Sequence, residues 1–284
     1  LDLALYHLQT GNIKDAIFRL WIIDTFISKD DEEVKNLLGW SYYLRGNLKT
    51  SLNYFSLAAQ NNENIIKFLS PNNSLEEIPF DIYVTYRNYQ AQYFDSFFMD
   101  KSVYLPFKFA NMCLPHLEKL PENSRILDLG SSTGLAAAEL NALALGQLFK
   151  ITAVESSGEM INYTNKNHEN LYFKIYRSNL DNFLTENTTQ YDVVLSFCSL
   201  SYKRNLTENI GKLCSLLSTE GLAALCFEFS MGQTELNNKK SHFVYNKTEL
   251  LSCILEKNNF ILTNSEEICC NEKNYIIIIC QKAV

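Results

Sequence analysis

The sequence has no long apolar run and no excess of positive charge. Its longest purely apolar stretches, such as Ile276–Cys280, fall far short of the roughly 20 residues that a membrane-spanning helix needs. Lysine and arginine number 25 against 32 acidic residues, which gives a formal net charge of −7 and a pI near 5.2. A chain of this charge is a poor general binder of phosphate backbones. We therefore expect neither a membrane nor a nucleic acid as its partner.

The cysteines lack the close pairs that metal and disulfide sites use. None of the eight belongs to a CxxC motif, and their neighbours are mostly apolar: Cys113, Cys198, Cys214, Cys226, Cys253, Cys269, Cys270 and Cys280. A zinc cluster would need different spacing and nearby histidines, and a disulfide framework is typical of much shorter chains. We interpret these residues as reduced thiols in the core of a cytoplasmic protein.

Length and composition predict about two compact units. The chain has 284 residues, of which 46% are hydrophobic and 20% are charged, so each unit can bury a core. It opens with Leu1-Asp2-Leu3, without an initiator methionine and without the basic and then apolar segments of a signal peptide. We therefore expect it to begin inside a longer gene product.

A repeat near the N-terminus predicts paired helices. The segment Gly11–Ile17 recurs 35 residues later as Gly46–Leu52, a period typical of helix–turn–helix repeats. The small and large residues by which such helices interlock are Leu38, Gly39, Tyr42, Ser51, Phe55 and Ala58 in the second copy, and Ala4, Ala16 and Leu20 in the first. Residues 1–62 resemble tetratricopeptide repeats. The resemblance implies a peptide-binding groove or, as two copies favour, a helical cap or dimer surface.

Between residues 70 and 122 the sequence predicts a linker and then aromatic helices. Proline and short polar residues break the helical pattern at 70–74. Aromatic residues then recur at the three- and four-residue steps of one helix face: Tyr83, Tyr86, Tyr89, Tyr93, Phe94, Phe97 and Phe98. An amphipathic helix at 105–120 leads to a turn at 121–124. We therefore divide the chain into a repeat segment (1–69), a linker with aromatic lid helices (70–122) and a C-terminal domain (123–284).

From Arg125 onward, short β-rich runs alternate with helical stretches, which is the pattern of βαβ units. We expect strands near 125–129, 151–155, 173–177, 191–197, 221–229, 260–268 and 274–282. A short polar turn separates the last two, so they should form an antiparallel hairpin at the sheet edge. The expected fold class is α/β: a seven-stranded, mostly parallel, Rossmann-like sheet with an antiparallel C-terminal hairpin, preceded by an all-α segment.

The first of these strands contains an acid and runs into a glycine turn. The sequence from Asp128 to Leu135 departs from the GxGxxG pattern of dinucleotide sites, and a carboxylate there would repel a pyrophosphate. It suits a ligand with a cationic amino group. A second acid, Glu155, ends the next strand, where it can bind a ribose diol. Amine, sulfonium and ribose together describe S-adenosylmethionine. Alternatively, Asp128 caps the following helix and Glu155 is an ordinary surface acid.

Four of these residues, Asp128, Gly130, Gly134 and Glu155, resemble the first two motifs of class I S-adenosylmethionine-dependent methyltransferases. The likeness spans 83–284 and includes Tyr191–Ser196, whose end resembles the motif beside the transferred methyl group. Most similar are bacterial tetratricopeptide-repeat proteins fused to a methyltransferase. Their aromatic-Asp pattern resembles Tyr93–Phe97, and their polar loop after the fifth strand resembles Ser241–Tyr245.

The resemblance implies roles for single residues. Gly130 and Gly134 would shape the cofactor turn, Asp128 would lie near the methionine amino group, and Glu155 would bind the ribose. Asn179 stands where the family often has an acid facing the adenine amino group, and its carbonyl can accept the same bond. Ser132 replaces a family glycine, and its side chain would narrow the cofactor channel. The full expected cofactor set is Asp128, Gly130, Ser131, Ser132, Gly134, Glu155, Ser156, Met160, Asn179, Leu180, Ser196, Phe197 and Tyr93.

Methyl transfer from a sulfonium requires mainly that the acceptor is positioned and, where necessary, deprotonated. Titratable candidates near the expected pocket rim are His242, Tyr245, Tyr202, Glu228 and Tyr93. His242 has the most suitable ordinary pKa for a base, although a histidine in a polar loop is equally typical of a solvated side chain. Tyr89 and Tyr93 form a lid over the cofactor or else pack as core aromatics. No metal is expected.

The sequence therefore predicts an S-adenosylmethionine-dependent methyltransferase acting on a small-molecule or carrier-bound acceptor, by O- or N-methylation. The aromatic helix favours a small, flat, apolar acceptor, whereas the repeats favour a protein partner. Two alternatives stay open. One is a protein methyltransferase that recognises its substrate through the repeats, and the other is a scaffold protein that retains the cofactor with little catalysis.

Overall fold

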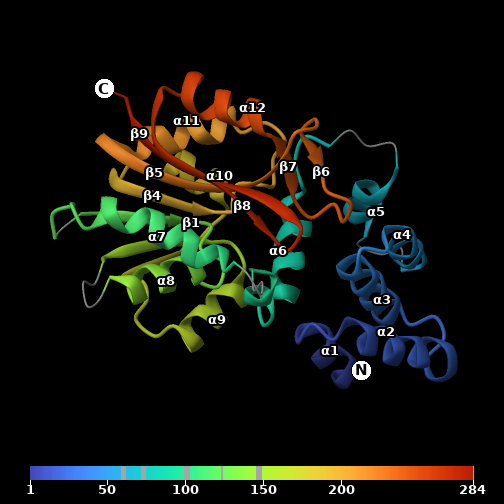
Figure 1. Ribbon diagram of the computed structural model, residues 1–284. Helices are drawn as coiled ribbons and strands as arrows, with labels where there is room; N and C mark the ends of the chain where they lie inside the picture. The colour runs from blue at the N-terminus through green and yellow to red at the C-terminus, as the bar shows by residue number, and fades with distance from the viewer. Residues whose placement is uncertain (59–61, 72–74, 99–102, 123, 145–148, 284) are drawn as a thin grey trace. The chain divides into compact units, whose positions relative to one another are not determined.

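The computed structural model of the chain describes residues 1–58, 62–71, 75–98, 103–122, 124–144 and 149–283 (Figure 1). The expected linker residues 72–74 and turn residue 123 lie outside these ranges. The chain forms two compact units, one of Leu1–Phe94 with Leu236–His242 and one of Asp95–Glu235 with Phe243–Val284. The boundary thus falls inside the expected 70–122 segment, which forms no unit of its own.

Six α-helices are described in the first unit: α1 (Asp2–Gln9), α2 (Ile13–Ile22), α3 (Glu32–Arg45), α4 (Leu48–Leu57), α5 (Glu63–Leu69) and α6 (Phe80–Gln90), with a π-helical turn at Ile23–Ile27. The two copies of the sequence repeat have the same turn. Gly11 and Gly46 have φ values of 81° and 83°, a left-handed conformation that glycine adopts without a steric penalty. Asn12 N donates to His7 O at 2.8 Å, and Asn47 N donates to Tyr42 O at 2.9 Å.

The second helical pair interlocks through a glycine. A Cβ atom placed on Gly39 would lie 2.8 Å from the ring of Phe55, so α3 and α4 approach closely at this point. Ser51 Oγ also donates to Gly39 O at 2.8 Å. Gly39, Ser51 and Phe55 thus make the close contact expected of them in the second copy, and Leu38 and Ala58 are buried. In the first copy Ala4, Ala16 and Leu20 are all buried in the core of the unit.

A short segment distant in sequence completes the first unit. The segment Leu236–His242 lies about 150 residues after these helices in the chain but belongs to the same unit. Tyr43 Oη donates to Lys240 O at 2.9 Å, and Lys240 Nζ donates to Phe68 O at 2.8 Å. Tyr43 is only 1% exposed, so its hydroxyl needs a hydrogen-bond partner within the protein. The carbonyl group of Lys240 provides this partner.

The second unit is built on one sheet. Its described strands are β1 (Ile126–Leu129), β2 (Ile151–Glu155), β3 (Lys174–Arg177), β4 (Tyr191–Phe197), β5 (Leu217–Ser230), β7 (Phe243–Asn246), β8 (Phe260–Cys270) and β9 (Lys273–Lys282), while β6 (Glu235–Leu236) spans the boundary between the units. The order is β3-β2-β1-β4-β5-β7-β6, and β9 pairs antiparallel with both β5 and β8. All seven expected strands are present with the expected hairpin. Within the described residues the sheet has nine strands instead of the expected seven, since the short β6 and β7 were not predicted.

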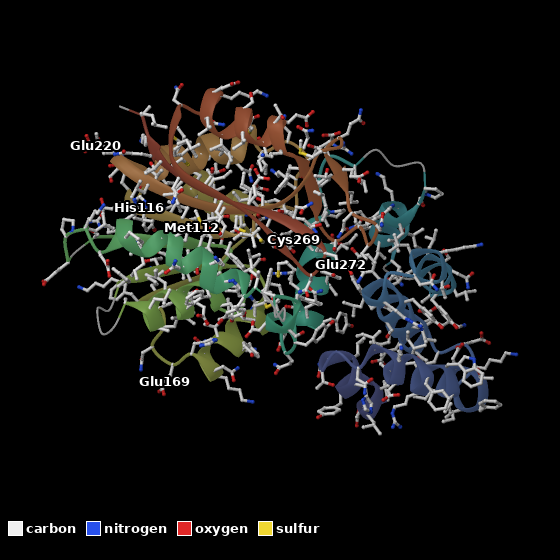
Figure 2. The ribbon with its side chains drawn as sticks, in the orientation of Figure 1. Met112, His116, Glu169, Glu220, Cys269 and Glu272 are labelled. Atoms are coloured by element: carbon white, nitrogen blue, oxygen red, sulfur yellow. The ribbon has the colours of Figure 1, made fainter. Side chains whose placement is uncertain are left out.

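Helices cover both faces of this sheet. They are α7 (Leu105–Leu117), α8 (Leu135–Leu143), α9 (Gly158–Asn167), α10 (Leu180–Glu186), α11 (Thr207–Leu216) and α12 (Lys247–Leu251), with a 3₁₀ turn at Phe94–Phe98 and a π-helical turn at Ser252–Glu256. Figure 1 shows α7, α8 and α9 on one face and α11 and α12 on the other, and Figure 2 labels Met112 and His116 on α7. Every residue of β1 is buried, as in a parallel sheet covered on both sides. Within the described ranges, no helix is both long and apolar enough to cross a bilayer.

Replacing Gly39 with alanine tests the α3–α4 contact. In an exposed helix this change stabilises by about 1 kcal/mol, but here the methyl group meets Phe55, so we expect a destabilisation of about 1–3 kcal/mol. The chain's two tryptophans, Trp21 and Trp40, both lie in the first unit. Tryptophan fluorescence during urea unfolding therefore reports on this unit. In a Phe55→Leu background the same glycine change should cost less, and an equal cost in both backgrounds would contradict the contact.

Candidate functional site

The turn that joins β1 to α8 has three residues in the left-handed conformation. Gly130, Ser132 and Gly134 have φ values of 75°, 53° and 82°. A Cβ atom on Gly130 would lie 2.3 Å from the Cβ atom of Ser199, so this position accepts only glycine. Ser132 stands where the family that this sequence resembles usually has glycine. Its left-handed conformation costs an L-residue about 1 kcal/mol. The backbone of the turn is therefore strained at Ser132, and other interactions must stabilise this conformation.

Glu155, at the end of β2, holds the turn through both of its carboxylate oxygens. Oε2 accepts from Ser132 N at 2.9 Å, and Oε1 accepts from Ser157 N at 2.7 Å. The residue is 4% exposed, so its interpretation as an ordinary surface acid was wrong. Because each carboxylate oxygen can accept more than one hydrogen bond, Glu155 retains capacity for a ligand's hydroxyl groups.

Asp128, on β1, is buried beside this turn. It is 1% exposed, and Tyr172 Oη donates to its Oδ2 at 2.6 Å. Burial raises the pKa of Asp128 to about 7; the Tyr172 hydrogen bond opposes this shift and the charge of Glu155 adds to it. The alternative that Asp128 caps the next helix was wrong, since the residue at the N-terminus of α8 is Gly134 and it has no side-chain cap. A buried carboxyl group of this kind is suited to forming an ion pair with a cationic ligand.

A third carboxylate fixes the turn from the N-terminal side. Thr133 Oγ1 donates to Asp95 Oδ1 at 2.6 Å, and Tyr163 Oη on α9 donates to Asp95 Oδ2 at 3.2 Å. Sequence reasoning noted Asp95 within the aromatic-Asp pattern but did not assign it these partners. It missed Tyr172 altogether, because nothing in the local sequence links a tyrosine after α9 to an acid on β1.

The other expected cofactor residues surround the turn by different contacts. Ser131 N donates to Val154 O at 3.0 Å, and Ser156 Oγ donates to Glu155 Oε1 at 3.4 Å. Met160 is fully buried, and its N–H donates to Ser157 Oγ at 3.1 Å at the start of α9.

The end of β3 contributes a helix cap. Asn179 Oδ1 accepts from Asp181 N at 2.9 Å and so caps α10. The carbonyl expected to face an adenine thus has one of its two lone pairs in use. Leu180 reaches the glycine turn, since its Cδ1 would lie 3.4 Å from a Cβ atom on Gly130.

The end of β4 is apolar on one face of the sheet and polar on the other. Ser196 is fully buried, and its Oγ lies 2.7 Å from Ser199 Oγ. The ring of Phe197 packs against those of Phe98 and Phe109, with centroids 5.0 and 5.3 Å apart. Ser196 therefore supports the loop beneath the turn, whereas Phe197 belongs to an aromatic wall.

Two of the candidate bases are structural residues. Tyr245 is buried, its Oη donates to Lys203 O at 2.6 Å, and burial raises its pKa well above the usual range. Tyr202 Oη donates to Asp181 Oδ1 at 2.9 Å and accepts from Asn209 Nδ2 at 2.7 Å. Both hydroxyl groups are occupied by bonds that organise the loop after β4. The structure therefore does not support Tyr202 or Tyr245 as proton acceptors.

Three further candidates occupy different surroundings. His242 belongs to the first unit, where Ser241 Oγ lies 3.0 Å from its Nδ1. Tyr93 also belongs to the first unit, where its ring lies 2.8 Å from the position of a Cβ atom on Gly11. Glu228, on β5, is in the second unit with the glycine turn, and Lys273 Nζ donates to its Oε2 at 2.6 Å. Of these candidates only Glu228 lies on the same sheet as Asp128.

These residues fit the cofactor that the sequence predicts. Asp128 offers a buried carboxyl to an ammonium group, Glu155 offers acceptor capacity to a diol, and the left-handed turn brings backbone close to whatever it binds. This donor set is the one that an amino acid joined to a ribose requires.

Comparison with known proteins agrees with this geometry. A family model described as a methyltransferase domain matches residues 120–271, which is more than half of the chain. No curated protein sequence matches the chain.

Solved structures share the fold at low sequence identity. The magnesium protoporphyrin IX methyltransferase of Synechocystis with bound S-adenosylhomocysteine is 14% identical, with a TM-score of 0.52 over 71% of this chain and 99% of its own. The 1,6-didemethyltoxoflavin-N1-methyltransferase of Burkholderia thailandensis is 16% identical, with a TM-score of 0.53 over 76% of this chain and 95% of its own. An N-methyltransferase of Haemonchus contortus with bound phosphomonomethylethanolamine is 10% identical, with a TM-score of 0.55 over 73% of this chain and 61% of its own.

The residues that shape the turn, Gly130, Ser132 and Gly134, and the acids beside it, Asp128 and Glu155, all lie within the segment that the family model matches. The chain belongs to the methyltransferase domain family, and it is an S-adenosylmethionine-dependent enzyme.

Proposed function

We propose that this enzyme transfers a methyl group from S-adenosylmethionine to a small-molecule acceptor, at an oxygen or nitrogen atom. The observation that carries the proposal is the pairing of a buried Asp128 with a Glu155 that anchors a left-handed glycine turn. The matched relatives of known structure act on a porphyrin, on a toxoflavin precursor and on a phosphorylated ethanolamine, all of them small molecules. Their shared fold supports the class of acceptor and no particular compound.

Each cofactor residue has a proposed task. The Asp128 carboxylate binds the ammonium group, Glu155 binds the ribose hydroxyls, and Asn179 faces the adenine amino group with its remaining lone pair. Backbone groups of the segment Gly130–Gly134 line the site, with Ser131 and Ser132 among them. The remaining residues of the second unit, Ser156, Met160, Leu180, Ser196 and Phe197, shape its walls.

S-Adenosylmethionine, when bound, supplies an electrophilic methyl group together with its own leaving group. The protein therefore has to orient the acceptor and accept its proton. Phe197, Phe98 and Phe109 form an apolar wall that suits a flat or hydrophobic acceptor and excludes water from it. The strand register supports a position for Glu228 near this wall, because Phe197 pairs with Cys226 and Glu228 lies two residues further along the same face of β5. We assign Glu228 the role of accepting or holding the acceptor's proton.

We further propose that the helical segment is a pair of tetratricopeptide-like repeats. The identical left-handed turns at Gly11 and Gly46 and the tight Gly39–Phe55 contact support this interpretation. With two repeats, a cap or dimer surface is favoured over a peptide groove. A protein acceptor recognised by the repeats stays the alternative, as does a scaffold with little catalysis.

Calorimetric titration with S-adenosylmethionine and S-adenosylhomocysteine tests the proposed function. We expect one-to-one binding with a dissociation constant in the micromolar range, about −8 kcal/mol. A Glu155→Gln variant should bind more weakly, because the amide nitrogen cannot accept the Ser132 or Ser157 N–H groups. Absence of binding by either ligand to the wild type would contradict the proposal and also the alternative of a scaffold that retains the cofactor.

The pKa of Asp128 predicts a pH dependence of binding. Burial raises this pKa from 3.8 to about 7, so the fold favours the protonated acid. Protonated Asp128 therefore stabilises the folded protein; this stabilisation is complete below a pH of about 4 and is lost as the pH rises through about 7. An ammonium ligand prefers the ionised acid, so affinity for S-adenosylhomocysteine should rise about tenfold between pH 6 and pH 8, with proton release on binding near neutrality.

Calorimetry in buffers of different ionisation enthalpy measures this released proton. Asp128→Asn should weaken binding at pH 8 and flatten its pH dependence, while Asp2→Asn, an exposed acid of the first unit, serves as the control. A wild-type affinity that does not change across this pH range would show that Asp128 does not face the ammonium group.

The role of Glu228 predicts a separation of turnover from cofactor binding. With an acceptor identified by screening for S-adenosylhomocysteine release, Glu228→Gln should lower kcat by about 100-fold or more, the usual contribution of a general base. The dissociation constant of S-adenosylhomocysteine should stay unchanged. Lys273→Met, which removes the ion-pair partner and keeps the acid, should have a smaller effect on kcat. Equal losses of cofactor affinity and turnover in Glu228→Gln would assign this residue to the fold instead.

A further inference from the structure

Two thiol groups lie side by side where β4 ends. Cys198 Sγ is 3.6 Å from Cys226 Sγ, and Cys198 N donates to Cys226 O at 3.1 Å. Both residues belong to the second unit: Cys226 lies on β5, and Cys198 directly follows β4, the parallel strand beside it. The backbone bond fixes the spacing between these residues independently of their side chains.

The spacing of the backbone suits a disulfide bond. Phe197 pairs with Cys226, so Cys198 is offset from Cys226 by one residue. The 3.1 Å hydrogen bond from Cys198 N to Cys226 O keeps the two backbones as close as neighbouring strands, which lie about 4.8 Å apart. Disulfides span Cα separations of about 4.4–6.8 Å. Closing the bond therefore requires rotation of side chains and little movement of strands.

The two sulfur atoms differ in access to solvent. Cys226 is fully buried in β5, whereas Cys198 is partly exposed and has a φ of 55° in the turn that follows Phe197. Burial and the neighbouring Cys198 thiol raise the pKa of Cys226 well above its usual range, so Cys226 stays protonated at neutral pH. An oxidant from solvent meets Cys198, and Cys226 is the resolving thiol beside it.

We propose that Cys198 and Cys226 form a dithiol that hydroperoxides convert reversibly to a disulfide. The Cys198 thiol transfers two electrons to the peroxide, which gives a sulfenic acid at Cys198 and one water from hydrogen peroxide. The Cys226 sulfur then attacks the Cys198 sulfur, the S–S bond forms, and the sulfenic oxygen leaves as a second water. A dithiol reductant reverses the step by thiol–disulfide exchange.

The position of the pair gives the disulfide a consequence for the cofactor site. Ser199 directly follows Cys198, its Oγ donates to Leu129 O, and its Cβ atom fills the space beside Gly130. Because Cys198 lies in the loop after β4, rotation of its side chain on bond closure acts on this loop and not on the strands, and it shifts Ser199, the residue that supports the glycine turn. We expect the oxidised protein to bind S-adenosylhomocysteine at least threefold more weakly, and this consequence, unlike the disulfide itself, rests on the proposed function.

Hydrogen peroxide treatment of the folded protein, followed by thiol titration in denaturant and peptide mapping, tests the proposal. We expect the thiol count to fall from eight to six, the mass to fall by about two daltons, and a single linked peptide pair containing Cys198 and Cys226. Dithiothreitol should restore eight thiols. Failure to form this link, or a link between other cysteines, would overturn the proposal.

Single variants separate the partners. Cys198→Ser should abolish the link while Cys269→Ser, which removes the exposed thiol labelled in Figure 2, should leave it unchanged. Cys226→Ser should leave the oxidised species at Cys198 as a sulfenic acid that dimedone captures. Because Cys226 is in the core and its variant can unfold, the wild-type map and the Cys198 variant are the decisive measurements.

Titration of the reduced and oxidised wild type with S-adenosylhomocysteine tests the consequence. A weaker affinity that dithiothreitol restores supports it, and equal affinity in the two states overturns it. Absence of binding in both states would instead contradict the proposed function, while peptide mapping would still decide whether the disulfide forms.

Discussion

The second unit depends on a backbone turn that one carboxylate holds in an unfavourable conformation. Ser132 keeps a left-handed conformation because its N–H is bonded to Glu155, and the same carboxylate also accepts from the start of α9. One buried acid thus ties together the ends of β1 and β2 and the helices that follow them. The resulting turn exposes backbone to a ligand, and the cost of about 1 kcal/mol for the serine is offset by charge-assisted hydrogen bonds.

Burial of a second acid connects stability to binding. Asp128 is buried in the sheet, where the Tyr172 hydroxyl donates a hydrogen bond to its Oδ2. A carboxyl in this environment resists ionisation, and a cationic ligand relieves that resistance. Binding of a cation at Asp128 is therefore coupled to ionisation of this acid, which makes the affinity depend on pH.

The helical unit and the methyltransferase sheet are joined at two places in the chain. One connection follows α6, and the other is the Leu236–His242 segment, which leaves the sheet between β5 and β7 and is held by Tyr43 and Phe68. His242 lies on this segment, and its ring is held beside Ser241 within the first unit. The residue with the best ordinary pKa for a base is thus part of the helical unit's own fold.

Much of this protein was determined by local sequence. Alternating β-rich and helical runs predicted seven of the strands and the C-terminal hairpin, and the repeat of a glycine-asparagine pair predicted the two helical turns, because these patterns depend on neighbours close in the chain. The sequence also identified Asp128, Gly130, Gly134 and Glu155, since a strand, a turn and the next strand always bring their ends to one edge of a parallel sheet. Tertiary structure decided the rest. The bonds from Tyr172 to Asp128 and from Thr133 to Asp95, the structural use of Tyr202 and Tyr245, and the meeting of Cys198 with Cys226 all join residues far apart in sequence. No local periodicity encodes such contacts, because they exist only once the sheet order brings the strand ends together.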